Sequence, residues 1–393
     1  QVKKQDKRLI HRGALKKRTL QRAHYFEQEG NLIMKRLFAL LISLVLVFSV
    51  STAALADITI AEATDKVLSR RLENGADEVL AFYDSWSATE YAAGNKPGKG
   101  FKVAVGTGDL VNDTALFGFW TTVRTLQALG CEVIYNIGDG SYSPNNAQVI
   151  ENFVAQRPDA IMWQFGNSQI LAAGLEKAAQ RGIPVFGIDN NLTGDTVISE
   201  VTADNFEIGR IAARYVINNL GGNGNVVDIF SSGHRGIETR NKMWELISAE
   251  FDGIKEIARI PWDNAAVQTS VRDRMEATLQ ANPSGTIQAV FACYDIPAMA
   301  AADAIKAAGR EDEMFVIGID GDREALIEVA KGGCLQATIS QDFTLMGMTI
   351  AFEIVDHLNG KEVPRFLYAP VTLVTADNAA DVYMQKYGEG LLQ

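Results

Sequence analysis

Residues 289–322 read AVFACYDIPAMAAADAIKAAGREDEMFVIGIDGD, and this stretch decides the fold class. Its two outer parts, Ala289–Ala292 and Phe315–Ile319, are short runs of apolar and β-branched residues. Between them, Pro297–Ala308 has the length and the apolar spacing of an amphipathic helix. A strand, a helix and a second strand in this order predict a βαβ unit with two parallel strands.

The same alternation extends over the chain from Phe101 onward. Further strand-like runs are Val103–Val105, Val133–Tyr135, Ala160–Trp163, Val185–Ile188, Val226–Phe230 and Gln336–Ile339. Helix-length stretches are Ala115–Leu129, Ala147–Ala155, Ile170–Ala179, Phe206–Leu220, Glu238–Glu250, Val267–Gln280, Arg323–Lys331 and Leu345–Leu358. The continuous apolar runs are typical of parallel strands covered on both faces. About four units precede Asp204 and about four follow it, which predicts two sheets in an α/β protein.

An export signal precedes this region. Met34-Lys35-Arg36 is followed by the apolar run Leu37–Val50 and then by Ala53-Ala54-Leu55-Ala56. A basic start, a short apolar stretch and an Ala-x-Ala site are typical of a secretory signal peptide, here cleaved after Ala56. The apolar run is shorter than the ~20 residues of a membrane span. The residue directly after the cleavage site is Asp57 and not a cysteine, so we expect a periplasmic protein without a lipid anchor.

Residues 1–100 are therefore divided further. Residues 1–33 lie upstream of a better start and are interpreted as a non-native extension, and residues 34–56 form the signal peptide. Residues 57–93 have helix-like apolar spacing, and Gly94–Gly100 is rich in glycine and lysine. We interpret residues 57–100 as a helical extension followed by a linker.

Charge and composition limit the partners. The chain of 393 residues is 47% hydrophobic and has a net charge of −11; residues 1–56 contribute +8, so residues 57–393 carry −19. An acidic chain argues against nucleic acid or an anionic membrane as a partner. Only His234 and His357 follow residue 56, and the three cysteines include no Cys-x-x-Cys pair. We therefore expect that the protein holds no metal and no cofactor. We also expect the cysteine thiols to be buried, although the periplasm would allow a disulfide.

Polar side chains recur at the ends of the predicted strands. In open α/β sheets, ligands bind at the carboxyl edge of the strands. Any single Asp or Asn there is better explained as a turn residue or a helix cap, so only the recurrence of such residues after several strands indicates a ligand site. Planar polar groups and rings together suit a neutral polyhydroxyl ligand. The candidates are Asn112, Asp113, Phe117, Trp120, Gln164, Phe165, Asp189, Asn190, Glu238, Arg240, Tyr294, Asp295, Asp320 and Gln341.

The motifs of common enzyme classes are missing from the sequence. Gly106-x-Gly108 follows the first strand, but Val111 stands where the dinucleotide fingerprint needs its third glycine. There is no phosphate-binding loop and no Gly-x-Ser-x-Gly nucleophile elbow. His234 lies in a glycine-flanked loop and is predicted to be a surface or cleft-edge residue. We therefore expect no enzymatic activity.

Three stretches stand in order along the chain: GTIQAVFACYD (residues 285–295), VIGIDG (316–321) and QATISQ (336–341). Taken together, they resemble the ribose-binding-like group of type I periplasmic binding proteins of bacterial ABC importers. The resemblance covers about Phe101 to Thr375. It implies two doubly wound parallel-sheet lobes joined by a hinge of three crossings, near Asp204, Gln341-Asp342 and Ala369-Pro370. The implied lobes are residues 101–204 with 342–369, and residues 205–341 with 370–393.

The resemblance also implies roles for individual residues. Asp189, Arg240, Asp320 and Gln341 stand where members of the family bond a sugar, and Gln164 stands where many have Asn. Phe117, Trp120 and Trp262 are the candidate stacking rings. Asn190 replaces a frequent Arg and Tyr294 a frequent Asn, which argues against assigning ribose itself. The expected ligand is a sugar or polyol.

The implied function is capture of that ligand by a monomer, which closes on it and passes it to the membrane permease of an ABC importer. Three alternatives share the fold: the sensing domain of a regulator, a receptor for chemotaxis, and a binding protein for a non-sugar solute.

Overall fold

The structure is a computed structural model that describes residues 71, 75–140, 143–166, 168–190, 192–194 and 196–388. The predictions for residues 1–33 and 34–56, and most of the predicted helix before residue 75, lie outside the described residues. In the described part of the chain, no helix combines the length and the apolar character needed to cross a membrane.

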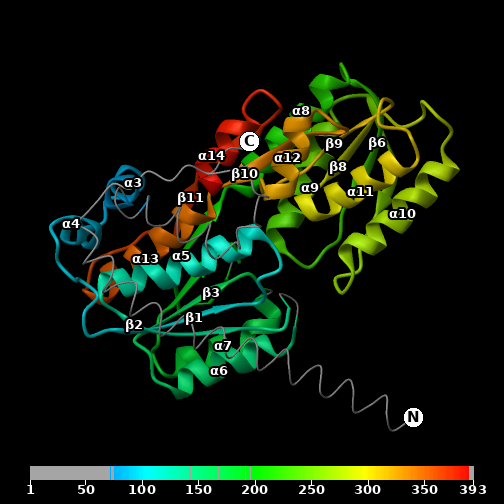
Figure 1. Ribbon diagram of the computed structural model, residues 1–393. Helices are drawn as coiled ribbons and strands as arrows, with labels where there is room; N and C mark the ends of the chain where they lie inside the picture. The colour runs from blue at the N-terminus through cyan, green and yellow to red at the C-terminus, as the bar shows by residue number, and fades with distance from the viewer. Residues whose placement is uncertain are drawn as a thin grey trace, which may run out of the picture. The chain divides into compact units, whose positions relative to one another are not determined.

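Two six-stranded sheets organise the chain, with the orders β11-β5-β4-β3-β1-β2 and β12-β10-β9-β8-β6-β7 (Figure 1). The strands are β1 (Lys102–Thr107), β2 (Glu132–Ile137), β3 (Ala160–Gln164), β4 (Val185–Ile188), β5 (Val197–Ala203), β6 (Asn223–Ile229), β7 (Gly253–Ile260), β8 (Ala289–Ala292), β9 (Phe315–Ile317), β10 (Leu335–Gln341), β11 (Phe366–Ala369) and β12 (Val371–Val374). The helices are α3 (Gly75–Phe82), α4 (Trp86–Ala92), α5 (Asp113–Leu129), α6 (Asn146–Ala155), α7 (Ser168–Gln180), α8 (Asn205–Asn219), α9 (Arg235–Ser248), α10 (Val267–Ala281), α11 (Asp295–Ala307), α12 (Arg323–Lys331), α13 (Phe343–Leu358) and α14 (Ala379–Tyr387).

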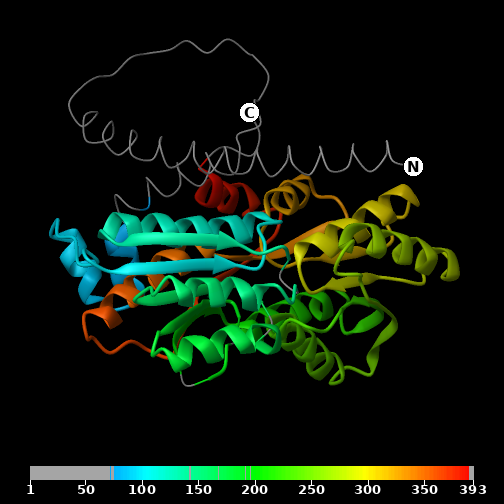
Figure 2. The ribbon, with the colours of Figure 1, turned by 90° about the horizontal axis from the view of Figure 1, so that it is seen from below.

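Each sheet forms one lobe together with the helices that cover it. The first lobe contains the sheet of β1–β5 and β11, and the second lobe contains the sheet of β6–β10 and β12. The chain passes between the lobes after β5, after β10 and after β11, and Figure 2 shows the two lobes side by side. All strand pairs are parallel except β10 with β12, which are antiparallel. The predicted α/β class with two largely parallel sheets is confirmed.

The first sheet is covered on both faces because its strands alternate between two apolar clusters. Val103 and Val105 of β1 belong to the cluster that includes residues of α5 and α13, whereas Ala104 packs with residues of α6 and α7. Helices α5 and α13 approach closely at Gly347, where an added Cβ would lie 2.7 Å from the carbonyl oxygen of Gly118. Glycine at this position therefore sets the distance between the two helices.

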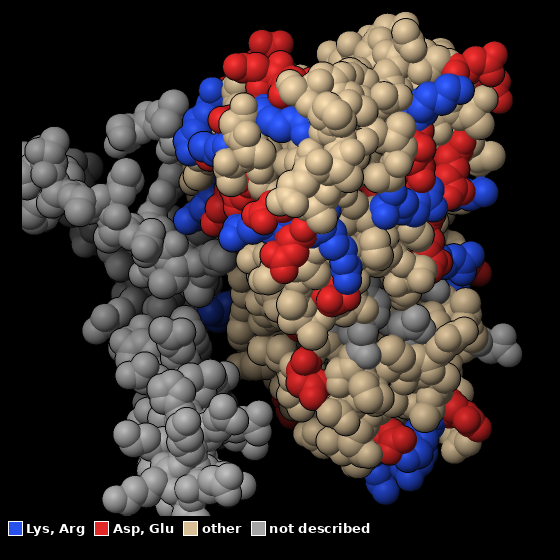
Figure 3. All heavy atoms as spheres, turned by 90° about the vertical axis from the view of Figure 1, so that its right-hand side faces the viewer, with Lys and Arg blue, Asp and Glu red and all other residues tan. Residues whose placement is uncertain are grey.

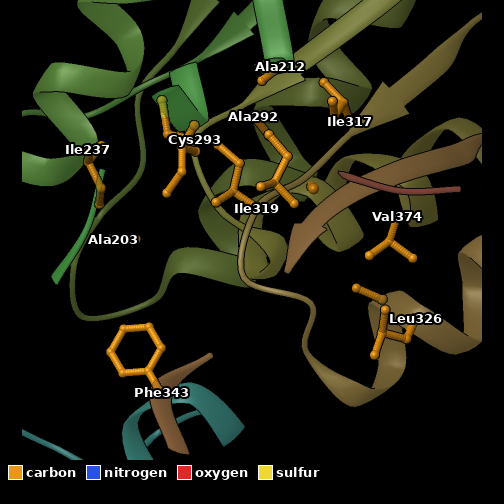
Figure 4. Close-up of a cluster of buried hydrophobic side chains, with 14 of the residues drawn as sticks. Ala203, Ala212, Ile237, Ala292, Cys293, Ile317, Ile319, Leu326, Phe343 and Val374 are labelled. Carbon is orange, nitrogen blue, oxygen red and sulfur yellow. The ribbon is translucent and has the colours of Figure 1, made fainter. Parts of the chain in front are cut away.

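The second lobe has its own buried apolar side chains. Figure 4 shows Ile317, Ile319 and Cys293 near the ends of β8 and β9, with Leu326 of α12 and Val374 of β12 nearby. All three cysteines are free and buried. On the surface seen in Figure 3, acidic and basic side chains are interspersed, and pairs such as Arg272–Asp303 (3.2 Å) join neighbouring helices.

The predicted helix over residues 57–93 is two helices, α3 and α4, in its described part. Asp356 of α13 fixes the segment between them. Its carboxylate accepts hydrogen bonds from the hydroxyls of Tyr83 (3.2 Å) and Ser85 (2.8 Å) and from the backbone N–H of Ser87 (2.7 Å). Ser85 also caps α4, which explains why the helix starts anew there.

Replacing Asp356 by Ala should lower the free energy of unfolding by about 2–4 kcal/mol, because it leaves buried donors without an acceptor. Urea denaturation measures this change. Asp273→Ala, at an exposed position of α10, is the control and should change stability by less than about 0.5 kcal/mol. An equally small effect for Asp356→Ala would contradict this account of the extension.

Candidate functional site

The carboxyl ends of strands from both sheets line one cavity of about 510 Å³. This volume lies within the usual range of about 300–1,000 Å³ for small-molecule sites. The first lobe contributes residues after β1, β2, β3 and β4 and at the start of α13, and the second contributes residues after β6, β7, β8 and β9. The lining residues are Asp109, Val111, Asn112, Thr114, Asp139, Gly140, Ser143, Phe165, Asp189, His234, Ile237, Arg240, Asn264, Ala265, Val267, Tyr294, Ile296, Asp320 and Phe343.

Strained backbone is concentrated at this cavity. Among the described non-glycine residues, φ is positive at Phe165 (52°), Asp189 (51°), Asp320 (124°) and Arg157 (51°). The first three directly follow or lie just beyond the ends of β3, β4 and β9 and line the cavity. Such a conformation costs on the order of 1–3 kcal/mol at each residue and is typical of functional sites, where the surroundings enforce it.

Arg240 of α9 is held rigidly although it is almost completely buried. Its Nε donates to Oδ1 of Asn205 (2.7 Å), and its Nη1 donates to the carbonyl oxygen of Cys293 (3.0 Å). The Asp320 carboxylate lies 3.7 Å from Nη1 and accepts a hydrogen bond from Nε2 of Gln341 (2.7 Å). Nη2 is the guanidinium nitrogen that takes part in none of these bonds.

Asp189 brings a second buried carboxylate to the cavity from the opposite lobe. Its Oδ1 accepts a hydrogen bond from the hydroxyl of Thr202 (2.9 Å). Its backbone oxygen lies 3.1 Å from Nε2 of His234, which belongs to the second lobe. His234 therefore bridges the lobes at the cavity, and its Nδ1 is buried with no hydrogen-bond partner among the described residues.

Three aromatic rings line the cavity: Phe165, Tyr294 and Phe343. Phe165 and Phe343 meet edge to face with ring centroids 5.7 Å apart. Phe343 stands at the start of α13, and Figure 4 shows it with Ile237 of α9, which also lines the cavity. The site thus combines apolar ring surface with charged and amide groups.

A group of buried carboxylates in the second lobe extends from Asp320 at the cavity to Asp322 and Asp295 behind it. Asp295 accepts from the backbone N–H of Asp322 (2.9 Å) and the hydroxyl of Thr338 (2.7 Å). Burial raises the pKa of Asp320 to about 6, although Arg240 opposes the shift. Burial, followed by the charge of Asp320, raises the pKa of Asp322 to about 7. Burial also raises the pKa of Asp295 well above its usual range.

The structure brings six of the predicted ligand-binding residues to the cavity: Asn112, Phe165, Asp189, Arg240, Tyr294 and Asp320. Three others stand directly behind it. Gln341 orients Asp320, Asp295 supports the loop of Asp322, and Trp262 packs against Tyr294 with centroids 5.3 Å apart.

The remaining candidates lie away from the cavity lining. Gln164 is buried and donates to the carbonyl oxygen of Ala115. Trp120 packs on Tyr135, with centroids 5.4 Å apart. Asn190 and Glu238 line a separate hollow of about 520 Å³. Asp113 and Phe117 contact Tyr387 of α14.

Several lining residues were not among the predicted ligand-binding residues, notably Asp109, His234 and Phe343. Each had a signal. Asp109 and His234 follow strand-like runs at the carboxyl edge, and Phe343 follows directly on the predicted crossing at Gln341-Asp342. In the described residues, no group of three or more His, Cys, Asp or Glu side chains is arranged to hold a metal ion.

A sequence model of the family described as "Periplasmic binding protein domain" matches residues 122–362. The chain belongs to this family. It is 31% identical over 232 residues to the ribose import binding protein RbsB of Bacillus subtilis, which covers 58% of this chain and 72% of that protein. It is 29% identical over 259 residues to the D-allose-binding periplasmic protein of Escherichia coli, covering 63% and 80%.

Solved structures agree with this assignment. A solute-binding protein of an ABC transporter from Agrobacterium vitis with bound allitol superimposes with a TM-score of 0.68 at 26% identity, covering 73% of this chain and 99% of that one. The predicted membership of the ribose-binding-like group is confirmed. Because the family consists of non-catalytic solute-binding proteins, the chain is a solute-binding subunit and not an enzyme.

The raised pKa values give a prediction for this periplasmic binding protein. Asp322 has a pKa of about 7 in the folded protein against 3.8 for a free carboxyl, so the folded state holds the proton more tightly. Stability should therefore be greatest below about pH 4 for this group, and fall as the pH rises to about 7 by at most about 1.4 kcal/mol per unit. Asp322→Asn should flatten that decline.

Urea denaturation at several pH values between 4 and 8 measures the effect. Asp303→Asn, at an exposed position of α11, is the matched control and should leave the pH profile of the wild type unchanged. If the free energy of unfolding of Asp322→Asn varies with pH as in the wild type, Asp322 is not the group that binds a proton more tightly in the folded state.

Proposed function

We propose that the chain captures a single sugar or polyol in the cavity between its lobes and delivers it to the membrane permease of an ABC importer. One observation carries this proposal: Asp189 of the first lobe and Arg240 and Asp320 of the second line the same cavity. A ligand that bonds all three makes its full set of contacts only when the lobes are together. It therefore shifts the protein toward the closed form.

The lining chemistry favours a neutral polyhydroxyl ligand. Carboxylates accept hydrogen bonds from hydroxyl groups, a guanidinium donates to hydroxyl oxygens, and these charge-assisted bonds are strong. The rings of Phe165, Tyr294 and Phe343 offer apolar surface for the C–H faces of a sugar. Arg240 already lies beside Asp320, so the described lining residues offer no surplus cation to an anionic solute.

The names of the relatives support the same ligand class, since they are binding proteins for ribose, D-allose and allitol. In this proposal, Asn112, Asp189, Arg240 and Asp320 bond hydroxyl groups. His234 joins them through Nδ1, which is an acceptor when Nε2 donates to Asp189. Gln341, Asp295 and Trp262 act through the residues that they support.

The proposal extends to export and assembly. We infer that residues 34–56 are removed after Ala56, that the protein acts in the periplasm as a monomer, and that residues 101–204 with 342–369 and 205–341 with 370–393 move as two bodies. The three crossings, after β5, β10 and β11, would form the hinge.

Binding of a sugar should raise the melting temperature. A ligand at about 100 times its Kd stabilises the folded state by about 2.7 kcal/mol. Thermal-shift measurements with D-ribose, D-allose, allitol and other sugars and polyols test this expectation. A shift with amino acids or purines but with none of the sugars would overturn the ligand class.

Asp189→Asn should weaken binding of the active sugar by about tenfold or more, because the amide lacks the charge that strengthens hydroxyl bonds. Asn tolerates the left-handed backbone that this position requires, so the fold should persist. Isothermal titration calorimetry measures Kd, and Asp303→Asn serves as the charge-matched control. Equal Kd values for both variants would remove Asp189 from the site.

Export should leave a chain that begins at Asp57. The intact mass of the protein recovered from the periplasm of a Gram-negative host measures the cleavage point. A mass that retains residues before Asp57, or a protein found only in the cytoplasm, would contradict the signal peptide.

A further inference from the structure

Tyr387, the last residue of α14, is completely buried at the junction of the two lobes. Its ring packs against Phe117 of α5 with centroids 5.5 Å apart, and the guanidinium of Arg323 lies 5.0 Å from the ring. In Figures 1 and 2, α14 lies beside α12 and above α5. Phe117 belongs to the first lobe and Arg323 to the second, so both lobes cover Tyr387.

Hydrogen bonds join the same elements across the lobes. The hydroxyl of Tyr387 donates to Oδ2 of Asp113 (2.7 Å), and the backbone N–H of Arg323 donates to the same oxygen (3.2 Å). Beside them, the hydroxyl of Thr114 donates to Oδ1 of Asp322 (2.9 Å). Asp113 and Thr114 form the first turn of α5 in the first lobe, whereas Asp322 and Arg323 begin α12 in the second.

We propose that Tyr387, bonded to Asp113, is the centre of a clasp that holds the two lobes closed and thereby positions the ligand-binding residues of both. The clasp consists of Asp113, Thr114, Asp322, Arg323 and Tyr387. This inference rests on the hinge closure in the proposed function, and adds a contact that the ligand does not make.

The clasp is continuous with the ligand cavity in both lobes. In the first lobe, the two sequence neighbours of Asp113, Asn112 and Thr114, line the cavity. In the second lobe, Asp320 lines the cavity, and Asp322 of the clasp lies two residues after it. Lys386 of α14 donates to the carbonyl oxygens of Asp320 and Gly321 (both 2.8 Å), which ties the clasp helix to this strand end.

The groups of the clasp have fixed roles as donors and acceptors. Burial, followed by the charge of Asp113, raises the pKa of Tyr387 well above its usual range, so the phenol keeps its proton and donates. The bond to a carboxylate is charge-assisted, and Asp113 is only 5% exposed. The charged groups that face the clasp from neighbouring elements are Asp295 of α11, Asp320 after β9 and Lys386 of α14.

Tyr387→Phe tests the clasp because it removes one oxygen and keeps the ring contacts with Phe117 and Arg323. Spin labels at Ala179→Cys on α7 and Asp273→Cys on α10, both exposed, report the distance between the lobes. The native cysteines are buried, so labelling is confined to the introduced sites. Double electron–electron resonance on the purified protein without sugar should show that the ratio of closed to open forms falls by about tenfold in Tyr387→Phe.

Asp113→Ala should give the same loss, and Thr114→Val a smaller one. Tyr215→Phe, on α8 of the second lobe and packed against Phe315, is the matched control and should leave the distances unchanged. Circular dichroism verifies that each variant folds. Identical distance distributions in the wild type, Tyr387→Phe and Asp113→Ala would overturn the clasp. A sugar that raises the melting temperature in that case would leave the proposed function intact, so the two failures are distinguishable.

Discussion

The burial of Arg240 is the constraint around which the site is built. Among the described residues that line the cavity, it is the only lysine or arginine, and a buried guanidinium needs acceptors for its N–H groups. Those acceptors are Oδ1 of Asn205, after the first crossing, and the carbonyl oxygen of Cys293, at the end of β8; the Asp320 carboxylate adds an ion pair at 3.7 Å. The guanidinium thus links the segment after the first crossing to the ends of two strands. Asp320 is in turn oriented by Gln341 at the second crossing, so two of the crossings and the cavity share one polar network.

The fold could be predicted to a large extent because its strands and helices are separated by clear changes of pattern. The strands β4 and β8 and the helix α12 begin and end where the sequence predicts. The strands that were not predicted have a physical reason in common. β7, β11 and β12 are edge strands with exposed or half-buried residues, and β5 carries the buried polar residues Ser199 and Glu200 in its middle. Polar residues interrupt β5, β7 and β12, whereas β11 (FLYA) is apolar but has only four residues, two of them exposed.

The site could be predicted only in part, for a different reason. A residue that directly follows a strand lies at the carboxyl edge of the sheet. The sequence does not show in which direction its side chain points. Asn112 lines the cavity, whereas its neighbour Asp113 turns toward Tyr387, more than 270 residues away in sequence. Likewise Phe117, a ring at the start of α5, packs on Tyr387. The C-terminal helix α14 gave no signal in the alternation of strands and helices, so its contacts with α5 could not be foreseen.

Capture of a ligand requires that closure be nearly balanced without it. If the lobes closed strongly on their own, ligand would add little, because a ligand shifts an equilibrium only by its differential affinity for the two forms. The bonds of Tyr387 and Thr114 across the lobes favour closure. The same closure brings Asp113 of the first lobe next to Asp322 of the second and buries Asp320 beside them. Desolvation of these carboxylates and their mutual repulsion oppose it, as the raised pKa values of Asp320 and Asp322 indicate. The favourable bonds and the unfavourable burial lie in the same few residues. In the proposed function, a ligand that donates hydroxyl groups to Asp189 and Asp320 would tip the balance by stabilising carboxylates that the closed form has taken out of water.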